Sequence, residues 1–426
     1  MNKYWLITYG CQMNQSDSER IAAVLESIGN KSASSIDEAD LIVINACSVR
    51  QSAIDRIWGQ VSKFKKLKTT NHKLRTILTG CVLKNDKRQF SKNFDLIFDI
   101  KDLPKLPKIL EAEENIISEN YLKIEPDYSN NFTAQVPIMT GCNNFCTFCV
   151  VPYTRGREIS RPAEEIICEI KNLIERGHKE IWLLGQNVNS YHSEQKTENK
   201  EQKITFPKLL RMVNDISGNF WIRFTSSHPK DFSDGLIKAM KNCDKVTEYL
   251  NLPIQSGDDA VLRRMNRPYT IEQYKYLVNK VKKEIPNICL STDVIVGFPD
   301  EQEYQFQNTI KLFEEIKYDM AYISQYSPRA GTQANKFKDD ISHREKKRRW
   351  KLLSDILRKT ALEKNEVYVG KNIEVLPDGY ESGFLTGKSR SYKTVKFKGP
   401  KNLIGQFIKV KVLEALPWRL RGKLIK

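Results

Sequence analysis

The chain has 426 residues, of which 40% are hydrophobic, and a net charge of +17. This length favours two or three domains. The mean hydropathy of −0.51 and the lack of any apolar run near the roughly 20 residues that span a bilayer exclude a helical membrane protein, and since no export signal precedes the first strand, we expect a cytoplasmic protein.

The first 125 residues predict a small parallel α/β domain. Three apolar segments alternate with helices, which is the pattern of a parallel sheet built through right-handed crossovers. The first helix is expected over Ser16–Ile28, with Ser16 as its N-cap, and the second ends near Leu67. Ile100–Asn131 has a poorer pattern and is expected to be a connection. The predicted strands are Lys3–Thr8, Asp40–Asn45 and Arg75–Thr79.

Residues 128–365 predict a partial (βα)6 barrel. Six strand candidates alternate with amphipathic helices, two units short of the eight in a complete barrel. His192–Lys203 is polar and charged, and we expect it to be a mobile loop. The strands are Gln135–Met139, Glu180–Leu184, Trp221–Thr225, Glu248–Ile254, Ile288–Val296 and Asp319–Tyr326. The helices are Ala163–Arg176, Pro207–Ile216, Phe232–Asn242, Ile271–Glu284 and Glu301–Ile316.

The end of the chain predicts a helix followed by a small β-barrel. Ser342–Asn365 is expected to be helical. Residues 366–426 alternate with period two between glycines, which is typical of a small antiparallel barrel of OB-like size. The apolar stripe of the helix consists of Leu352, Leu353, Ile356 and Leu357.

The basic excess is concentrated in the same region. Ser342–Asn365 has nine basic and three acidic residues, and Glu366–Lys426 has thirteen and five. The two segments supply +14 of the net charge of +17. Such a local excess favours docking of a polyanion, most simply a nucleic acid. The alternative is an ordinary, solvated surface rich in lysine.

The strongest chemical signal is a cysteine-rich loop after the first barrel strand. In a cytoplasmic chain, nine cysteines are more typical of metal ligands or catalytic groups than of disulfides. Cys142, Cys146 and Cys149 form a C-x3-C-x2-C motif, which can bind three irons of a [4Fe–4S] cluster and leave the fourth open. The alternative is a zinc knuckle, but it needs four ligands, and Cys168 lies too far along its helix to be the fourth.

This motif, with Phe148 before its last cysteine, resembles the signature of the radical S-adenosylmethionine (SAM) superfamily. The resemblance implies that the open iron chelates SAM, and that an electron from the cluster cleaves SAM to a 5′-deoxyadenosyl radical. It makes Cys142, Cys146 and Cys149 catalytic as well as metal-binding, and gives Phe148 a place at the cofactor. It also implies a partial barrel, which the strand pattern predicts independently.

Three isolated cysteines form a second signal. Cys11, Cys47 and Cys81 each lie just past the C-terminal end of a predicted parallel strand. Ligand sites of open α/β sheets form at those ends, so we expect the three sulfurs to converge and bind a second cluster with one open iron. The alternative is that all three are core cysteines.

Motifs over nearly the whole chain then resemble the methylthiotransferase family, and in the barrel its MiaB branch. The resemblance implies that two SAM molecules are used, one to methylate sulfur on the N-terminal cluster and one to supply the radical. It implies insertion of methylthio at C2 of N6-isopentenyl-adenosine beside a tRNA anticodon, and a C-terminal TRAM domain that binds RNA. The motifs lie at residues 8–14, 45–50, 79–81, 150–156, 226–229, 252–257, 291–299, 385–388 and 404–405.

Polar residues follow several barrel strands at the end where barrel active sites lie. Gln186, Ser226, Gln255 and Asp293 are our candidates for hydrogen bonds to SAM. Turn and helix-capping roles are the alternative for such residues. His228 precedes a proline and is expected to be structural rather than an acid–base group. Cys243 and Cys289 are expected in the core.

The chain departs from the family pattern at two places. Asp300 stands where the branch usually has glycine, so a turn beside the SAM site is expected to differ. Val82-Leu83-Lys84 replaces the usual Met-Ala-Gln after Cys81. That change affects the surroundings of the second cluster but not its ligands.

The expected partners are a tRNA anticodon stem-loop and an electron donor such as flavodoxin or ferredoxin, and the protein is expected to be a monomer. One alternative is a sibling enzyme that acts on threonylcarbamoyl-adenosine or a ribosomal protein. The basic C-terminal barrel disfavours a protein substrate, and the Val151-Pro152-Tyr153 context disfavours both. The other alternative is a non-catalytic RNA-binding protein with structural clusters.

Overall fold

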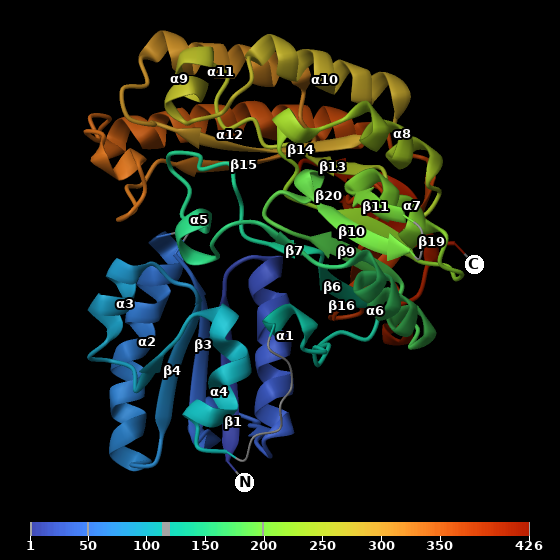
Figure 1. The fold of residues 1–426 in the computed structure, drawn as a ribbon. Helices are drawn as coiled ribbons and strands as arrows, with labels where there is room; N and C mark the ends of the chain where they lie inside the picture. The colour runs from blue at the N-terminus through green and yellow to red at the C-terminus, as the bar shows by residue number, and fades with distance from the viewer. Residues whose placement is uncertain (1, 49–50, 113–119, 198–199, 426) are drawn as a thin grey trace.

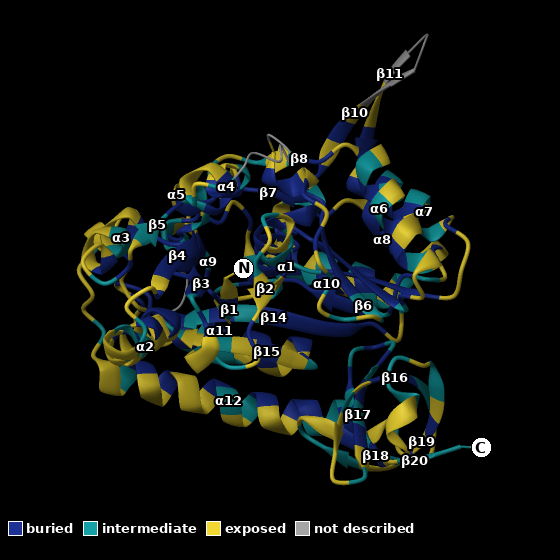
Figure 2. Cartoon of the chain, turned by 90° about the horizontal axis from the view of Figure 1, so that it is seen from below, coloured by how far each residue is buried: buried dark blue, intermediate teal, exposed yellow. Residues whose placement is uncertain are grey.

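A computed structural model describes residues 2–48, 51–112, 120–197 and 200–425. Val49 and Arg50 of the second cysteine motif, and residues 113–119 of the expected connection, lie outside the described residues. The N-terminal domain lies below the larger barrel in Figure 1. In the view from below, α12 (His343–Glu366) runs along one side of the molecule to the small C-terminal barrel (Figure 2). No helix of the described residues is long and apolar enough to cross a membrane.

The N-terminal domain is the parallel α/β unit that the sequence predicts. Its sheet has the order β2-β1-β3-β4-β5, with all neighbours parallel. Every residue of β3 is buried, since the central strand is covered on both faces. The strands are β1 (Lys3–Tyr9), β2 (Lys31–Ser32), β3 (Leu41–Cys47), β4 (Arg75–Cys81) and β5 (Leu96–Ile97). The helices are α1 (Gln12–Ser27), α2 (Gln51–Thr70), α3 (Lys84–Phe90) and α4 (Leu106–Ile109).

The predicted start of α1 is wrong. The helix begins at Gln12, and Cys11 is its N-cap. The side-chain oxygen of Asn14 accepts from the backbone N–H of Cys11 at 3.4 Å, so the first turn closes four residues earlier than the sequence predicts. Ser16 is buried inside the helix, where its hydroxyl donates to the carbonyl of Gln135 at 3.0 Å. Its role is contact with the barrel rather than capping.

The expected connection is also more ordered than its pattern indicates. In its described part, Ile100, Leu103 and Leu106 pack with Leu122 in one apolar cluster. That cluster also includes Trp182 of the barrel. The segment is therefore a part of the core that joins the two domains.

All six predicted barrel strands are present, and they are parallel. They form two three-stranded sheets, β6-β9-β12 and β13-β14-β15, joined by a bridge between Ile222 and Val246. The strands are β6 (Thr133–Pro137), β9 (Glu180–Leu184), β12 (Trp221–Phe224), β13 (Tyr249–Asn251), β14 (Cys289–Val296) and β15 (Met320–Gln325). The helices are α6 (Ala163–Glu175), α7 (Phe206–Asn214), α8 (Asp234–Asn242), α9 (Asp259–Arg264), α10 (Ile271–Glu284) and α11 (Glu303–Ile316).

Three local predictions for this region need correction. His192–Lys203 is not a loop but part of an antiparallel hairpin of β10 (His192–Thr197) and β11 (Lys200–Thr205), because Ser193 and Ile204 are buried and anchor it to the barrel. Helix α9 was not predicted. On α12, Leu353 and Leu357 are buried but Leu352 is 37% exposed, because the buried face continues through Lys346 and Arg349 rather than Leu352.

The C-terminal barrel is closed, with the order β16-β17-β18-β20-β19. Its pairs are antiparallel as predicted, except that β18 and β20 are parallel. The strands are β16 (Asn372–Glu381), β17 (Phe384–Ser389), β18 (Thr394–Lys398), β19 (Ile408–Leu416) and β20 (Arg419–Leu424).

The β17–β18 turn of this barrel docks on the N-terminal ends of the large barrel strands. Arg223 donates to the carbonyls of Ser389 and Arg390, each at 2.7 Å. The Lys393 ammonium pairs with Asp319 at 2.7 Å, and both side chains are more than nine-tenths buried. The smaller barrel thus closes the lower end of the larger one.

Because of this ion pair, we expect Lys393→Ala to lower the free energy of unfolding by about 3–5 kcal/mol, which is the usual cost of an uncompensated buried charge. Lys398 is exposed on the neighbouring strand, so Lys398→Ala is the matched control and should change stability by less than about 0.5 kcal/mol. Urea denaturation of both variants measures the difference. Equal stability of the two would show that the Asp319 pair is not formed.

Candidate active site

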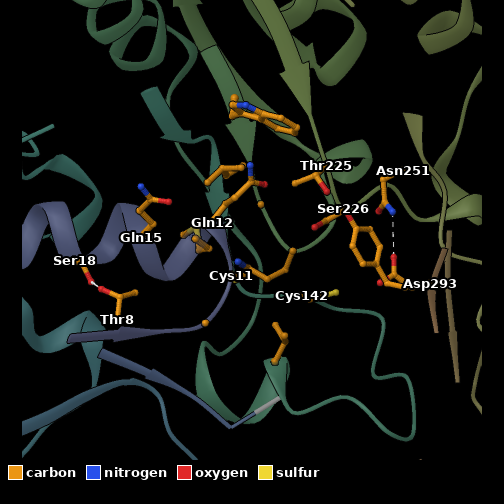
Figure 3. A pocket seen from close by; sticks show the side chains of 18 of the residues that line it. Thr8, Cys11, Gln12, Gln15, Ser18, Cys142, Thr225, Ser226, Asn251 and Asp293 are labelled. Atoms are coloured by element: carbon orange, nitrogen blue, oxygen red, sulfur yellow. Dashed lines mark hydrogen bonds between the residues drawn. The ribbon is translucent and has the colours of Figure 1, made fainter. Parts of the chain in front are cut away.

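A single cavity of about 1230 Å³ receives residues from all three parts of the chain. Figure 3 labels lining residues of the N-terminal domain and the large barrel, among them Cys11 and Cys142. Cys11 enters the cavity from the N-terminal domain, and Cys142 from the large barrel. Tyr392 of the docking turn lies at its lower end, where its ring packs against Trp182 and Tyr249 with centroid distances of 5.1 and 4.6 Å. The cavity therefore runs from the cysteines to an aromatic floor.

The C-x3-C-x2-C loop follows β7 (Met139–Thr140) and folds tightly on itself. At Gly141, φ is +79° and a Cβ atom would lie 2.0 Å from the carbonyl oxygen of Arg157, so only glycine fits there. The backbone N–H of Cys142 then donates to the carbonyl of Gly156 at 3.2 Å. This closure directs Cys142, Cys146 and Cys149 into the cavity.

These thiols are suited to metal binding rather than to nucleophilic catalysis. Burial raises the pKa of Cys149 to about 12, and burial also raises the pKa of Cys142. The Arg267 guanidinium points to Cys146 Sγ at 3.6 Å and brings positive charge to the site. Since metal ligands must be thiolates, binding of a metal would release these protons.

The donor set fits an iron–sulfur cluster. Three soft sulfur ligands face one cavity, and a cationic side chain is available to offset the negative charge of a cluster. Among the described residues, no three His, Cys, Asp or Glu side chains are close enough together to hold a single metal ion. The three sulfur ligands of a [4Fe–4S] cubane can lie farther apart than the ligands of a single metal ion, because each cysteine binds a different iron.

The three N-terminal cysteines lie near one another, with Cys11 and Cys47 each beside Cys81. Cys47 and Cys81 are the last residues of β3 and β4 and are direct register partners, rather than residues past the strand ends. The pKa of the Cys81 thiol is raised well above its usual value, first by its hydrogen bond to Cys47 and then by burial. Cys11 is exposed where it faces the cavity, and desolvation by the surrounding protein and the neighbouring Cys81 raise the pKa of its thiol.

Every predicted cofactor-binding residue lines the same cavity, as does Asn251, which sequence reasoning missed. Asn251 donates from Nδ2 to Asp293 Oδ2 at 3.1 Å, the contact drawn in Figure 3. Ser226 and Gln255 have φ values of +65° and +74°, and left-handed backbone at non-glycine residues is typical of functional sites. The predicted residues are Phe148, Gln186, Ser226, Gln255 and Asp293.

Several polar atoms beside the cavity lack a partner. Gln186 Oε1, Ser227 Oγ and His228 Nε2 are buried without a hydrogen bond to any described residue. Buried polar atoms are nearly always satisfied in native proteins, so their concentration here indicates a place for a polar ligand. Burial, with the charges of Arg267 and Lys230, lowers the pKa of His228 to about 2, so its imidazole stays neutral and agrees with a structural rather than an acid–base role.

The remaining cysteines lie elsewhere. Cys168 is exposed on α6, and Cys243 and Cys289 are buried in core clusters. Sequence reasoning also missed Arg267 and the aromatic floor. The sequence offered one signal for the aromatic floor. Side chains along β9 point alternately to the two faces of the strand, which places Trp182 on the face opposite to Ile181 and Leu183.

Three family descriptions match successive parts of the chain. Residues 3–99 match the uncharacterized protein family UPF0004, residues 136–313 match the Radical SAM superfamily, and residues 366–425 match the TRAM domain. Among solved structures, the radical SAM methyltransferase TsrM from Kitasatospora setae superposes with a TM-score of 0.57 at 11% identity, over 84% of this chain and 89% of that one. This likeness shows the fold alone.

Relatives at higher identity cover the full length. A tRNA-2-methylthio-N(6)-dimethylallyladenosine synthase of Thermoanaerobacter sp. (strain X514) is 42% identical over 99% of this chain and 93% of its own. A protein of the same name from Clostridium botulinum (strain Langeland / NCTC 10281 / Type F) is 41% identical over 100% of this chain and 97% of its own. The chain therefore belongs to the family of the tRNA-2-methylthio-N(6)-dimethylallyladenosine synthases, within the radical SAM superfamily.

Proposed function

We propose that this protein inserts a methylthio group at C2 of N6-isopentenyl-adenosine, immediately 3′ of a tRNA anticodon. The observation that carries the proposal is one cavity that Cys11 enters from the N-terminal domain and Cys142, Cys146 and Cys149 from the barrel. Cys81 neighbours Cys11 and pairs with Cys47 behind it. The names of the full-length relatives support the same substrate. Their names favour it over threonylcarbamoyl-adenosine or a ribosomal protein.

The chemistry explains why two adjoining sites are needed. C2 of the adenine ring carries an unactivated C–H bond, so polar substitution is not available. The bound SAM, reduced at a [4Fe–4S] cluster, would supply a radical that removes this hydrogen, and the second cluster would carry the sulfur. Each cluster would bind its three cysteines, Cys142, Cys146 and Cys149 in the barrel and Cys11, Cys47 and Cys81 in the N-terminal domain.

Other residues of the cavity would bind SAM and orient it. Gln186, Ser226, Gln255 and Asp293 present amide, hydroxyl and carboxylate groups suited to the ribose, amino and carboxylate groups of SAM. Phe148 offers an aromatic face to its adenine. Because the floor is closed by Tyr392, bulk water would be excluded from the lower end, which protects a reactive intermediate.

The proposal includes the partners and organisation expected from the sequence. We assign methylthiotransferase, radical SAM and RNA-binding roles to residues 1–125, 128–365 and 366–426. We further propose a cytoplasmic monomer that takes electrons from a flavodoxin or ferredoxin.

Two cysteine triple variants test the sites separately. Anaerobically reconstituted protein should hold about eight irons, four for each cubane. Replacing Cys142, Cys146 and Cys149 by Ala should halve the iron and abolish SAM cleavage. Replacing Cys11, Cys47 and Cys81 should also halve the iron, because it removes only one cluster, and should leave SAM cleavage in place.

Iron analysis and chromatography of 5′-deoxyadenosine measure these effects, and nucleoside mass spectrometry of tRNA from a deletion strain tests the product. Full iron in the N-terminal triple variant would contradict the second cluster. Normal 2-methylthio-N6-isopentenyl-adenosine in the deletion strain would contradict the substrate.

RNA docking is expected on the outer face of the C-terminal barrel. Of the three lysines that the sequence places near β18, Lys393 is excluded as a phosphate contact by its buried pair with Asp319. Lys396 is half-buried, with its ammonium 5.2 Å from the ring centroid of Phe384, and Lys398 is exposed. Deleting residues 366–426 would also uncover the cavity floor, so point variants give the cleaner test.

We expect Lys396→Ala/Lys398→Ala to weaken tRNA binding and to lower the slope of log affinity against log salt by about 0.9 or less for each lost phosphate contact. The reason is that each contact releases counterions. The control is Lys238→Ala/Lys283→Ala, a pair of exposed lysines on α8 and α10. Filter binding across a salt series measures the slope, and equal slopes for the two pairs would place docking elsewhere.

Asp300 lies outside the proposed SAM site, contrary to the expectation from the sequence. It does not line the cavity, and its side chain is 67% exposed. Its φ of +60° shows that the turn keeps the conformation that glycine favours. Left-handed backbone costs a non-glycine residue about 1–2 kcal/mol.

We therefore expect Asp300→Gly to stabilise the protein by about 1 kcal/mol, less a few tenths for the lost contact of Gln302 Nε2 with Asp300 Oδ1 at 2.9 Å. The SAM dissociation constant should not change. Urea denaturation and equilibrium dialysis with SAM measure the two quantities. A shift in the SAM constant would place Asp300 at the cofactor after all.

A further inference from the structure

Arg155 connects the two cysteine sites. Its backbone follows the C-x3-C-x2-C loop and ends the short helix α5 (Val151–Thr154). Its side chain is only 2% exposed and crosses into the N-terminal domain. There Nε donates to Cys81 Sγ at 2.9 Å, and Nη2 donates to Asp17 Oδ2 at 2.5 Å.

The geometry is not that of a simple ion pair. The guanidinium contacts the Asp17 carboxylate through one nitrogen only, and Asp17 Oδ1 has no hydrogen-bond partner in the described part of the chain. A bidentate contact would have satisfied both oxygens. Instead Nε is directed at a sulfur, and Nη1 lies 3.4 Å from the Tyr121 hydroxyl.

We propose that Arg155 is a positioning residue through which the radical SAM barrel raises the reduction potential of the cluster held by Cys11, Cys47 and Cys81. An N–H donor to a ligating sulfur, and a nearby positive charge, stabilise the reduced and more negative cluster. The inference rests on the proposed function, because it requires that cluster. Beyond that function, a residue of the barrel would set the reduction potential of the cluster in the N-terminal domain.

The neighbouring Asp17 gives the proposal a second, opposite consequence. Its carboxylate partly cancels the charge of Arg155. Removing the carboxylate should therefore raise the potential, whereas removing the guanidinium should lower it. A residue that merely locked the two domains together would not produce shifts of opposite sign.

The experiment uses the full chain carrying Cys142→Ala, Cys146→Ala and Cys149→Ala, so that only the N-terminal cluster remains. After anaerobic reconstitution, the iron content is measured, and a dithionite titration followed by electron paramagnetic resonance gives the midpoint potential. In this background Arg155→Gln should lower the ratio of reduced to oxidised cluster at least tenfold at a fixed potential, a shift of 59 mV for one electron. Asp17→Asn should shift the ratio in the opposite direction, and Arg155→Lys should give a smaller decrease than Arg155→Gln.

Arg267→Lys is the matched control, since Arg267 is another buried arginine of the barrel but belongs to the other site, where its partner Cys146 is already replaced in this background. It should leave the potential of the N-terminal cluster unchanged. If Arg155→Gln does not fold, the opposite shifts of Arg155→Lys and Asp17→Asn still decide the question. Four irons with unshifted potentials would overturn this inference alone, whereas no iron in the parent variant would overturn the proposed second cluster and this inference with it.

Discussion

The position of α1 against the first barrel strand determines whether the two cysteine sites can share a cavity. The Ser16 hydroxyl joins α1 to the backbone of β6 at 3.0 Å, and Arg20 donates to the same hydroxyl at 2.7 Å. Both side chains are fully buried. Because Cys11 is the N-cap of this helix, any rotation of α1 would move Cys11 relative to Cys142. The polar contacts fix the register of the two domains, which apolar packing alone would not do.

The opposite end of the cavity depends on a different contact. The turn at residues 389–393 closes the barrel at the N-terminal ends of its strands. Arg223 satisfies two carbonyls of the turn, and Tyr392, with φ of +61°, turns its ring onto Trp182 and Tyr249. The TRAM domain therefore contributes Tyr392 to the cavity. Under the proposed function, docking of RNA and closure of the site would involve the same small domain.

The sequence predicted what depends on local pattern. Period-two and apolar runs located the barrel strands. The position of Cys11, Cys47 and Cys81 at the C-terminal ends of predicted parallel strands was enough to place them near one another, because topology brings such ends together. Prediction from the sequence failed where the role of a side chain depends on a contact with a residue far away in the chain. Ser16 was expected to be a cap but contacts β6. Lys393 belongs to the basic segment expected to dock a polyanion, but it is paired with Asp319, 74 residues away. No local pattern could have shown that Arg155 reaches Cys81.

Long-range pairing also changes what the net charge means. Several basic residues after Ile341 are neutralised by carboxylates that come earlier in the chain: Lys346 by Asp339, Arg349 by Glu301, Arg390 by Glu248 and Lys393 by Asp319. The value of +14 for this region is therefore an upper limit on the charge that RNA would meet. The exposed basic residues that remain lie in two places. On α12 they are Arg344, Lys347, Lys351, Arg358 and Lys359, and on the C-terminal barrel and the loop that leads into β19 they are Lys398, Lys401, Lys409, Lys411, Arg419 and Lys423.

This distribution separates two uses of positive charge in one protein. Arginines beside the cysteines are buried and act at short range, where the low dielectric strengthens the interaction of each charge with its neighbours. The exposed lysines of the small barrel would act at long range, where salt screens them. Salt should therefore weaken RNA docking without weakening the contacts of Arg155 and Arg267 with the sulfurs. The cavity can keep its electrostatic environment while the substrate binds and leaves.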